Sequence, residues 1–143
     1  MNKKLLKHTR KGRNYILQNY VYLVFLTKYT GSVLVDKIQA RLKDIFSETC
    51  QQMKCQLIEF EGSPDYVKLL ILIHPTVSIS NLVGKLKSKS SYFLVKEFPE
   101  DLGNKIIKNH LWSSSYCAVS HQNNATEITK NFIINNSLLD KTS

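Results

Sequence analysis

The sequence has no long apolar run, only three cysteines and few acidic residues, and each shortage excludes a class of protein. Its most apolar stretch begins at Val67 and stops at Pro75, well short of the roughly 18 residues that span a membrane. The basic amino terminus does not lead into the apolar core of a secretion signal. Cys50, Cys55 and Cys117 are odd in number, so a disulfide framework is not expected. We therefore expect a cytoplasmic protein with no membrane partner.

The shortage of acid accompanies an excess of base. Eleven Asp and Glu face twenty Lys and Arg, which gives a formal net charge of +9 and an isoelectric point near 9.5. This charge favours a polyanionic partner, nucleic acid before an anionic membrane, although lysines that only maintain solubility are the alternative. Residues 1–14 form a basic segment that we expect to stay mobile until it meets an anion. We place a single domain at 15–139 and a short tail at 140–143.

Hydrophobic periodicity predicts the order β, α, β, β, α, β, α. Strands are expected within 15–28, 56–61, 67–74 and 110–121, and helices within 33–53, 78–96 and 124–139. This order is that of a ferredoxin-like (split βαβ) α+β fold, an antiparallel sheet with both long helices on one face and a trailing carboxyl-terminal helix. Pro99 to Asn109 is expected to be a loop or a broken helix.

The entry to the third predicted strand carries the chemistry of interest. Pro64 and Asp65 predict a turn directly before the apolar run. Because side chains two apart share a face of a strand, Tyr66 and Lys68 are expected to project together.

Several segments resemble the single-tyrosine HUH transposases of the insertion-sequence 200/605 type. The resemblance covers about residues 12–136, and its markers are Tyr22-Leu-Val-Phe-Leu-Thr-Lys-Tyr29, Pro64-Asp-Tyr-Val-Lys-Leu-Leu70, Leu86-Lys-Ser-Lys-Ser-Ser91 with Phe98-Pro99, and His110-Leu-Trp-Ser113 before Tyr116. It implies a ferredoxin-like fold and a homodimer whose sheets merge through central strands. It also implies binding of hairpin or single-stranded DNA, and strand cleavage by a tyrosine with Mg²⁺ or Mn²⁺. Residues 20–26 are apolar on both faces, which suits such a dimer and equally a buried strand in a monomer.

The chain departs from the family at each catalytic position. The family has Pro-Asp-His-hydrophobic-His, and Tyr66 and Lys68 stand at the two histidines. An ammonium group has no lone pair for a metal. The family nucleophile lies in Tyr-Ile-x-Asn-Gln, where this chain has Phe132-Ile-Ile-Asn-Asn136 and therefore no phenol oxygen. We therefore predict a DNA-binding protein that is catalytically inactive, with no metal site and no cofactor.

Two alternatives remain open beside this prediction. One is an active transposase or strand nickase with Tyr66 as a relocated nucleophile, whose pKa Lys68 would lower. The other is a ferredoxin-like module that binds RNA.

The second predicted helix has no acid between Ile79 and Lys96, which favours a phosphate-contacting face. The predicted nucleic-acid contacts are Arg10, Lys11, Arg13, Lys28, Lys68, Lys85, Lys87 and Lys89.

Overall fold

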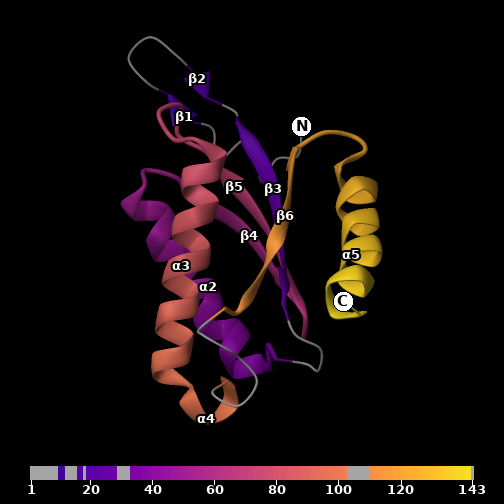
Figure 1. Cartoon of the computed structure of the whole chain (residues 1–143). Coiled ribbons are helices and arrows are strands. Elements are labelled where there is room, and N and C mark those ends of the chain that lie inside the picture. Colours follow the sequence, from indigo (N-terminus) through magenta and orange to yellow (C-terminus); the bar gives the residue numbers. More distant parts are fainter. Residues whose placement is uncertain (1–9, 12–15, 18, 29–32, 103–109, 143) are drawn as a thin grey trace.

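The computed structural model describes residues 10–11, 16–17, 19–28, 33–102 and 110–142, with side chains described for 19–28, 33–102 and 110–136 (Figure 1). Its strands are β1 (Arg10–Lys11), β2 (Ile16–Leu17), β3 (Tyr20–Thr27), β4 (Gln56–Gly62), β5 (Tyr66–Leu72) and β6 (Trp112–Ser120). Its helices are α2 (Asp36–Gln52), α3 (Ile79–Glu97), α4 (Pro99–Leu102) and α5 (Ala125–Thr142). Within the described ranges, no helix combines the length and the apolar character needed to cross a bilayer.

The main sheet has the strand order β4-β5-β3-β6, and each neighbouring pair is antiparallel. This confirms the predicted ferredoxin-like α+β fold. Strand β3 lies inside the sheet, because β5 pairs with one of its edges and β6 with the other. Both edges of β3 are thus occupied within the chain. A dimer that merges two sheets must use another strand, so the expected role of residues 20–26 in joining subunits is wrong.

The two faces of the sheet are covered by different helices. Figure 1 shows α2 and α3 packed on one face and α5 alone on the other. The apolar stripe predicted along α2 is buried at Ile38, Leu42, Ile45, Phe46 and Cys50. The prediction that the two long helices share a face is confirmed, and the trailing helix takes the opposite face.

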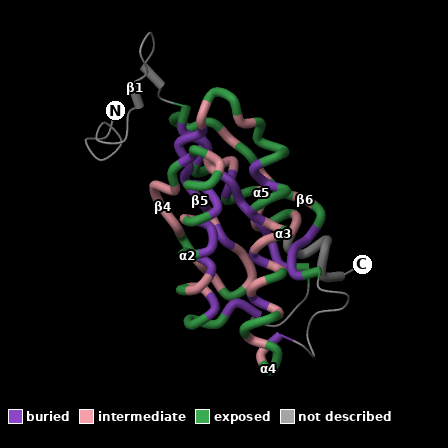
Figure 2. The backbone as a smooth tube through the Cα atoms, turned by 90° about the vertical axis from the view of Figure 1, so that its left-hand side faces the viewer, coloured by how far each residue is buried: buried purple, intermediate pink, exposed green. Residues whose placement is uncertain are grey.

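The larger core cluster lies between the sheet and the helices α2 and α3. Figure 2 shows the buried stretches of the chain in purple. Its centre is aromatic, since the Trp112 ring centroid lies 5.8 Å from that of Phe25 and 6.3 Å from that of Phe46. Trp112 Nε1 donates a hydrogen bond of 2.8 Å to the buried Ser90 Oγ on α3. A smaller cluster of Tyr20, Leu70 and Leu72 lies on the opposite face of the sheet. The face of the sheet toward α2 and α3 therefore carries the main core, and the face toward α5 carries a much smaller one.

The ends of the elements differ from the predictions in three places. The first long strand begins at Tyr20, after a short ladder in which Arg10 pairs with Leu17 and Lys11 with Ile16. The segment predicted as a loop or broken helix begins as α4, and residues 103–109 lie outside the described residues. Helix α5 extends through Thr142, beyond the limit of 139 expected from periodicity. The division of the chain at 14 and 139 stays a prediction.

Candidate nucleic-acid interface

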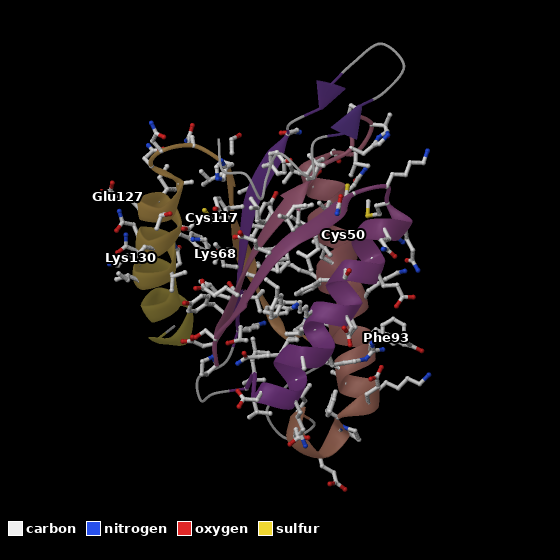
Figure 3. The ribbon with its side chains drawn as sticks, turned by 180° about the vertical axis from the view of Figure 1, so that it is seen from behind. Cys50, Lys68, Phe93, Cys117, Glu127 and Lys130 are labelled. Carbon is white, nitrogen blue, oxygen red and sulfur yellow. The ribbon has the colours of Figure 1, made fainter. Side chains whose placement is uncertain are left out.

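Tyr66 and Lys68 lie on the same face of the sheet, as their spacing predicted, and α5 covers that face. Lys68 is aligned with Val24 on β3 and with Glu61 on β4, and Val24 is aligned in turn with Cys117 on β6. Figure 3 shows Lys68 and Cys117 near each other between the sheet and α5. The Lys68 ammonium lies 4.8 Å from the centroid of the Tyr22 ring, a cation–π distance. Its positive charge is therefore held against the sheet.

A cavity of about 340 Å³ separates this part of the sheet from α5. We call it the α5 cavity, and its lining residues are Glu61, Tyr66, Lys68, Thr126, Thr129, Lys130, Ile133 and Ile134. Two cations and one carboxylate thus share the lining. Phe132 and Asn136, at the family positions of the nucleophile and the amide ligand, are half-buried and do not line it. The Asn136 amide donates a hydrogen bond of 3.2 Å to the Phe132 carbonyl of its own helix.

These residues do not fit the divalent metal that the family implies. Neither Tyr66 nor Lys68 offers the neutral imidazole that such a site needs, and the Lys68 ammonium repels a cation. Among the described residues, no three His, Cys, Asp or Glu side chains come close enough to hold a metal ion. Two of the described histidines have contacts elsewhere: His74 Nδ1 lies 2.7 Å from Thr76 Oγ1, and the His121 ring stacks on that of Tyr22 at 5.7 Å. They do not rebuild the site.

The pKa of Tyr66 is shifted in the direction that opposes nucleophilic attack. Burial raises the pKa of the phenol above its ordinary 10, and the charges of Glu61 and Asp65 raise it further. A hydrogen bond with Ser63 acts in the opposite direction and does not reverse the shift. A phenol attacks as the phenolate, which a raised pKa makes rarer. The net shift is thus opposite to the one that the alternative with Tyr66 as a relocated nucleophile calls for, and that alternative stays to be tested.

The three predicted contact lysines of α3, Lys85, Lys87 and Lys89, do not share one face. Lys85 is exposed. Lys87 points inward, where its ammonium donates hydrogen bonds of 2.7 Å to the Ser113 carbonyl and 3.3 Å to the Ser115 carbonyl. The Lys89 ammonium donates to Gln52 Oε1 on α2. The structure thus gives Lys87 and Lys89 partners within the chain and leaves Lys85 on the surface.

The inward direction of Lys87 follows from an irregularity in β6. Phe25 is aligned with Tyr116, but Thr27 is aligned with Trp112, so β6 has more residues than β3 between these two pairs. Residues 113–115 therefore bulge from the ladder. A bulge leaves backbone groups without ladder partners, and the Lys87 ammonium satisfies two of these carbonyls.

A second, larger cavity of about 590 Å³ lies where α3 meets the start of β6. We call it the α3 groove, and its lining residues are Lys28, Gly84, Lys87, Ser88, Ser91, His110, Leu111, Trp112, Ser113 and Ser114. The lining holds lysines, a histidine and serine hydroxyls, and no carboxylate. Cations and hydroxyl donors without an opposing acid are suited to an anion. The serines and His110 were absent from the predicted contacts, although both of their segments were markers of the family resemblance.

Of the predicted contacts, the structure brings Lys28 and Lys87 together in this groove, with Lys85 adjacent in sequence to Gly84 of its lining. Lys68 lies on the opposite side of the sheet, and Lys89 faces α2. Arg10 and Lys11 form β1, but their side chains lie outside the described part of the chain, as does the whole of Arg13.

Comparison with known proteins places the chain among transposases. Residues 15–136 match the family described as IS200-like transposases. The chain is 33% identical over 122 residues to the ISDra2 transposase TnpA of Deinococcus radiodurans, across 85% of this chain and 86% of that protein.

Solved structures agree with this match. A crystal structure of a candidate transposase from Deinococcus radiodurans superposes with a TM-score of 0.78 at 31% identity, over 88% of this chain and 96% of that one. A REP-associated tyrosine transposase bound to a REP hairpin superposes with a TM-score of 0.57 at 10% identity, over 85% and 67% of the two chains. At that identity, the second likeness concerns the fold alone.

Proposed function

The chain belongs to the IS200-like transposase family, and from this premise we propose that it binds hairpin or single-stranded DNA without joining itself to the strand. The observation that carries the proposal is the position of Lys68, whose ammonium lies against the Tyr22 ring at a place where the family resemblance implies a metal-binding histidine. A lysine there excludes the metal that strand joining would need, while the positive net charge of the chain still favours DNA.

DNA binding is supported by the positive net charge, by the lining of the α3 groove and by a structural neighbour. The net charge is +9, and the α3 groove offers cations and hydroxyls without a carboxylate. A structural neighbour is a tyrosine transposase that was solved with a REP hairpin bound. These observations favour DNA over a purely structural role for the lysines. The predicted RNA-binding module stays an alternative that binding competition can separate.

The absence of strand joining is supported by three side chains that fail together. Phe132 has no oxygen to attack a phosphorus atom, and Tyr66, which has one, has a raised pKa. The residue at the second histidine is Lys68. Groups that act together in catalysis lose activity as a unit, so each change alone costs most of the rate.

The test is a labelled hairpin with a single-stranded extension, incubated with the protein in Mg²⁺ or Mn²⁺. We expect a shifted band on a native gel and no covalent adduct on a denaturing gel. An adduct from the unmodified protein would overturn the proposal, and its mapping to Tyr66 would establish the relocated nucleophile. A hairpin RNA that competes better than the DNA at fixed salt would instead establish the RNA-binding module.

We also propose that the protein is a homodimer in which two copies of β6 pair edge to edge. The two outer strands of the sheet differ in how they are protected. Strand β4 carries Glu59 and Glu61, charges that oppose pairing with another chain, whereas β6 pairs with β3 in regular register from Tyr116 to Ser120. Strand β6 has no charged residue over its nine residues. An uncharged outer strand of this length is suited to a second copy of itself.

The backbone direction identifies a variant for testing this dimer. His121 donates its N–H to the Tyr20 carbonyl on β3, so by alternation Ala118 directs its N–H to the outside of the sheet. Ala118→Pro removes that donor without breaking a bond to β3, and Ala118→Val keeps it. We expect light scattering to give twice the 16.5 kDa chain mass for the unmodified protein and Ala118→Val, and the single mass for Ala118→Pro. A single mass for the unmodified protein at micromolar concentration would refute the dimer.

A further inference from the structure

We propose that the α3 groove and the exposed ring of Tyr92 form one track for an unpaired strand, with the backbone phosphates in the groove and one base stacked on Tyr92. The inference rests on the proposed DNA binding. It goes beyond it by naming the place and the kind of DNA, namely a strand with at least one unpaired base next to the bound phosphates.

The groove has the chemistry of a phosphate site. Lys28, just after β3, and His110, just before β6, contribute nitrogen groups, and Ser88 and Ser91 contribute hydroxyls from α3. The groove is open on the helix side at Gly84, where a methyl group added at the Cα would meet no atom within 4 Å. A volume of about 590 Å³ is within the range of small-ligand sites and accommodates a nucleotide.

Tyr92 continues this surface along the same helix. Lys85, Ser88, Tyr92 and Lys96 are spaced by three and four residues, and all four are exposed. They form one stripe along α3. Tyr92 lies one turn beyond Ser88, about 6 Å along the axis, which is comparable to the distance between neighbouring phosphates of a strand.

The Tyr92 ring is placed for stacking. Tyr92 is 60% exposed, the highest value among the large hydrophobic side chains of the described residues. The neighbouring Phe93 ring supports it edge to face at 5.2 Å, and the Lys96 ammonium lies 5.7 Å from its centroid. An exposed aromatic ring flanked by cations is the usual platform for a base of single-stranded nucleic acid. Paired bases inside a duplex do not present a face to such a ring, so the occupant must have an unpaired base.

The charge distribution distinguishes this track from the α5 cavity. The stripe on α3 has no acid from Ile79 to Lys96. In the α5 cavity, Lys68 and Lys130 share the lining with Glu61, and Glu127 lies on the same helix (Figure 3). A polyanion gains more from the track, because no carboxylate there opposes it.

The test measures affinity by fluorescence anisotropy for two DNAs, a hairpin with a single-stranded extension and the same hairpin with a blunt end. Lys85→Glu and Lys89→Glu are matched charge reversals on one helix, of which the first lies on the track and the second faces α2. We expect Lys85→Glu to weaken both DNAs about 10-fold at moderate salt and Lys89→Glu to change affinity less than 2-fold. The slope of log K against log salt should become shallower for Lys85→Glu by about one unit.

A second pair of variants tests the stacked base. Tyr92→Phe keeps the ring and Tyr92→Ala removes it. We expect Tyr92→Ala to weaken the extended hairpin about 10-fold, to leave the blunt hairpin unchanged, and to abolish the quenching of 2-aminopurine placed in the extension. Tyr92→Phe should behave as the unmodified protein. Thermal unfolding followed by circular dichroism confirms that each variant is folded.

The outcomes separate the two proposals. If the unmodified protein binds neither DNA, the proposed function fails. If it binds and the two charge reversals weaken it equally, or if Tyr92→Ala binds the extension as well as Tyr92→Phe does, this inference is wrong and DNA binding stands.

Discussion

The cavities on the two sides of the sheet are lined by different kinds of side chain. On the α5 side, Lys68 lies against Tyr22, Glu61 shares the cavity, and Tyr66 has a raised pKa. On the α3 side, the groove is lined by cations and hydroxyls without a carboxylate. The first cavity includes the two positions where the family resemblance implies metal-binding histidines, and its side chains do not fit a divalent metal, whereas the second is suited to phosphate.

Under the proposed function, DNA binding and strand-joining chemistry belong to separate places in this fold. The α3 groove and the α5 cavity lie on opposite sides of one sheet and share no lining residue. A substitution such as lysine for histidine at position 68 therefore changes the chemistry without touching the groove. The proposed function, DNA binding without strand joining, is the combination that this separation allows.

The strongest challenge to the comparison is to restore the chemistry. We expect Phe132→Tyr alone to form no covalent DNA adduct, because the metal site is still absent. Any gain should require Tyr66→His and Lys68→His as well, with Asn136→Gln to supply the amide. Denaturing gels with labelled hairpin in Mn²⁺ provide the measurement, and calorimetry shows whether the restored site binds Mn²⁺. An adduct from Phe132→Tyr alone would mean that the α5 side kept more function than its side chains indicate.

Thiol labelling reports on the α5 side while DNA is bound to the other. Cys50 is fully buried and its pKa is raised to about 12, so at pH 8 about one molecule in ten thousand carries the thiolate. Cys117 is half-buried, and the positive charge of Lys68 partly offsets the rise that burial causes in its pKa. We expect Cys117 to react with iodoacetamide at least 100-fold faster than Cys50, and its rate to keep rising above pH 9.

Bound DNA sharpens this measurement. Saturating hairpin should leave the rate at Cys117 unchanged if DNA occupies the α3 groove. Protection of Cys117 would place DNA in the α5 cavity instead. Lys68→Met should slow the labelling, because the pKa of Cys117 then rises further, and Cys117→Ser identifies the labelled site by mass spectrometry.

Lys87 joins the α3 groove to the core, and its removal should reduce stability. Lys87→Met keeps the apolar stem but leaves the Ser113 and Ser115 carbonyls without the ammonium. Hydrogen bonds to a charged group contribute about 1.5–3 kcal/mol, so we expect a loss of about 2 kcal/mol in the free energy of unfolding. Urea unfolding followed by circular dichroism measures it. Lys89→Met, with its exposed partner Gln52, should lose less than about 0.5 kcal/mol; equal losses would contradict the role given to the bulge.

The smallest expected effect is a gain at Gly84. An exposed glycine inside a helix costs about 0.5–1 kcal/mol relative to alanine, and the added methyl group meets no neighbour. Gly84→Ala should therefore raise the free energy of unfolding by about that amount. The methyl group is too small to close the groove, so DNA affinity should change less than 2-fold. Gly84→Leu, which projects further, should keep the stability and weaken DNA binding.

Much of the fold was predictable because its signals are local. The stripe of Ile38, Leu42 and Phe46 and the alternation around Tyr66 and Lys68 fix which face each side chain takes, and the structure confirms both. The edge position of β6 follows from strand order, which the split βαβ plan implies. The start of β3 at Tyr20 was placed too early, because Tyr15 and Ile16 also favour strands and extended the predicted strand toward the amino terminus.

The sites were less predictable because they depend on contacts between distant segments. Lys85, Lys87 and Lys89 were treated as one basic face, but steps of two on a helix turn by about 200°, so Lys87 had to point away from the others. The different direction of Lys87 could therefore have been predicted from the sequence. The bulge that receives Lys87 and the ring of Tyr22 beneath Lys68 arise from register between strands. No local pattern shows either.

Trp112 gives the molecule a built-in optical probe. The indole belongs to β6, lies edge to face with Phe25 of β3, approaches Phe46 of α2 and donates to Ser90 of α3. It is the single tryptophan of the chain, and it is 6% exposed. Its emission should therefore be blue-shifted in the folded state, and it should report on the packing of β3, β6, α2 and α3 against one another. An emission transition that precedes the loss of helical ellipticity would show that the packing around Trp112 is lost before the helices unfold.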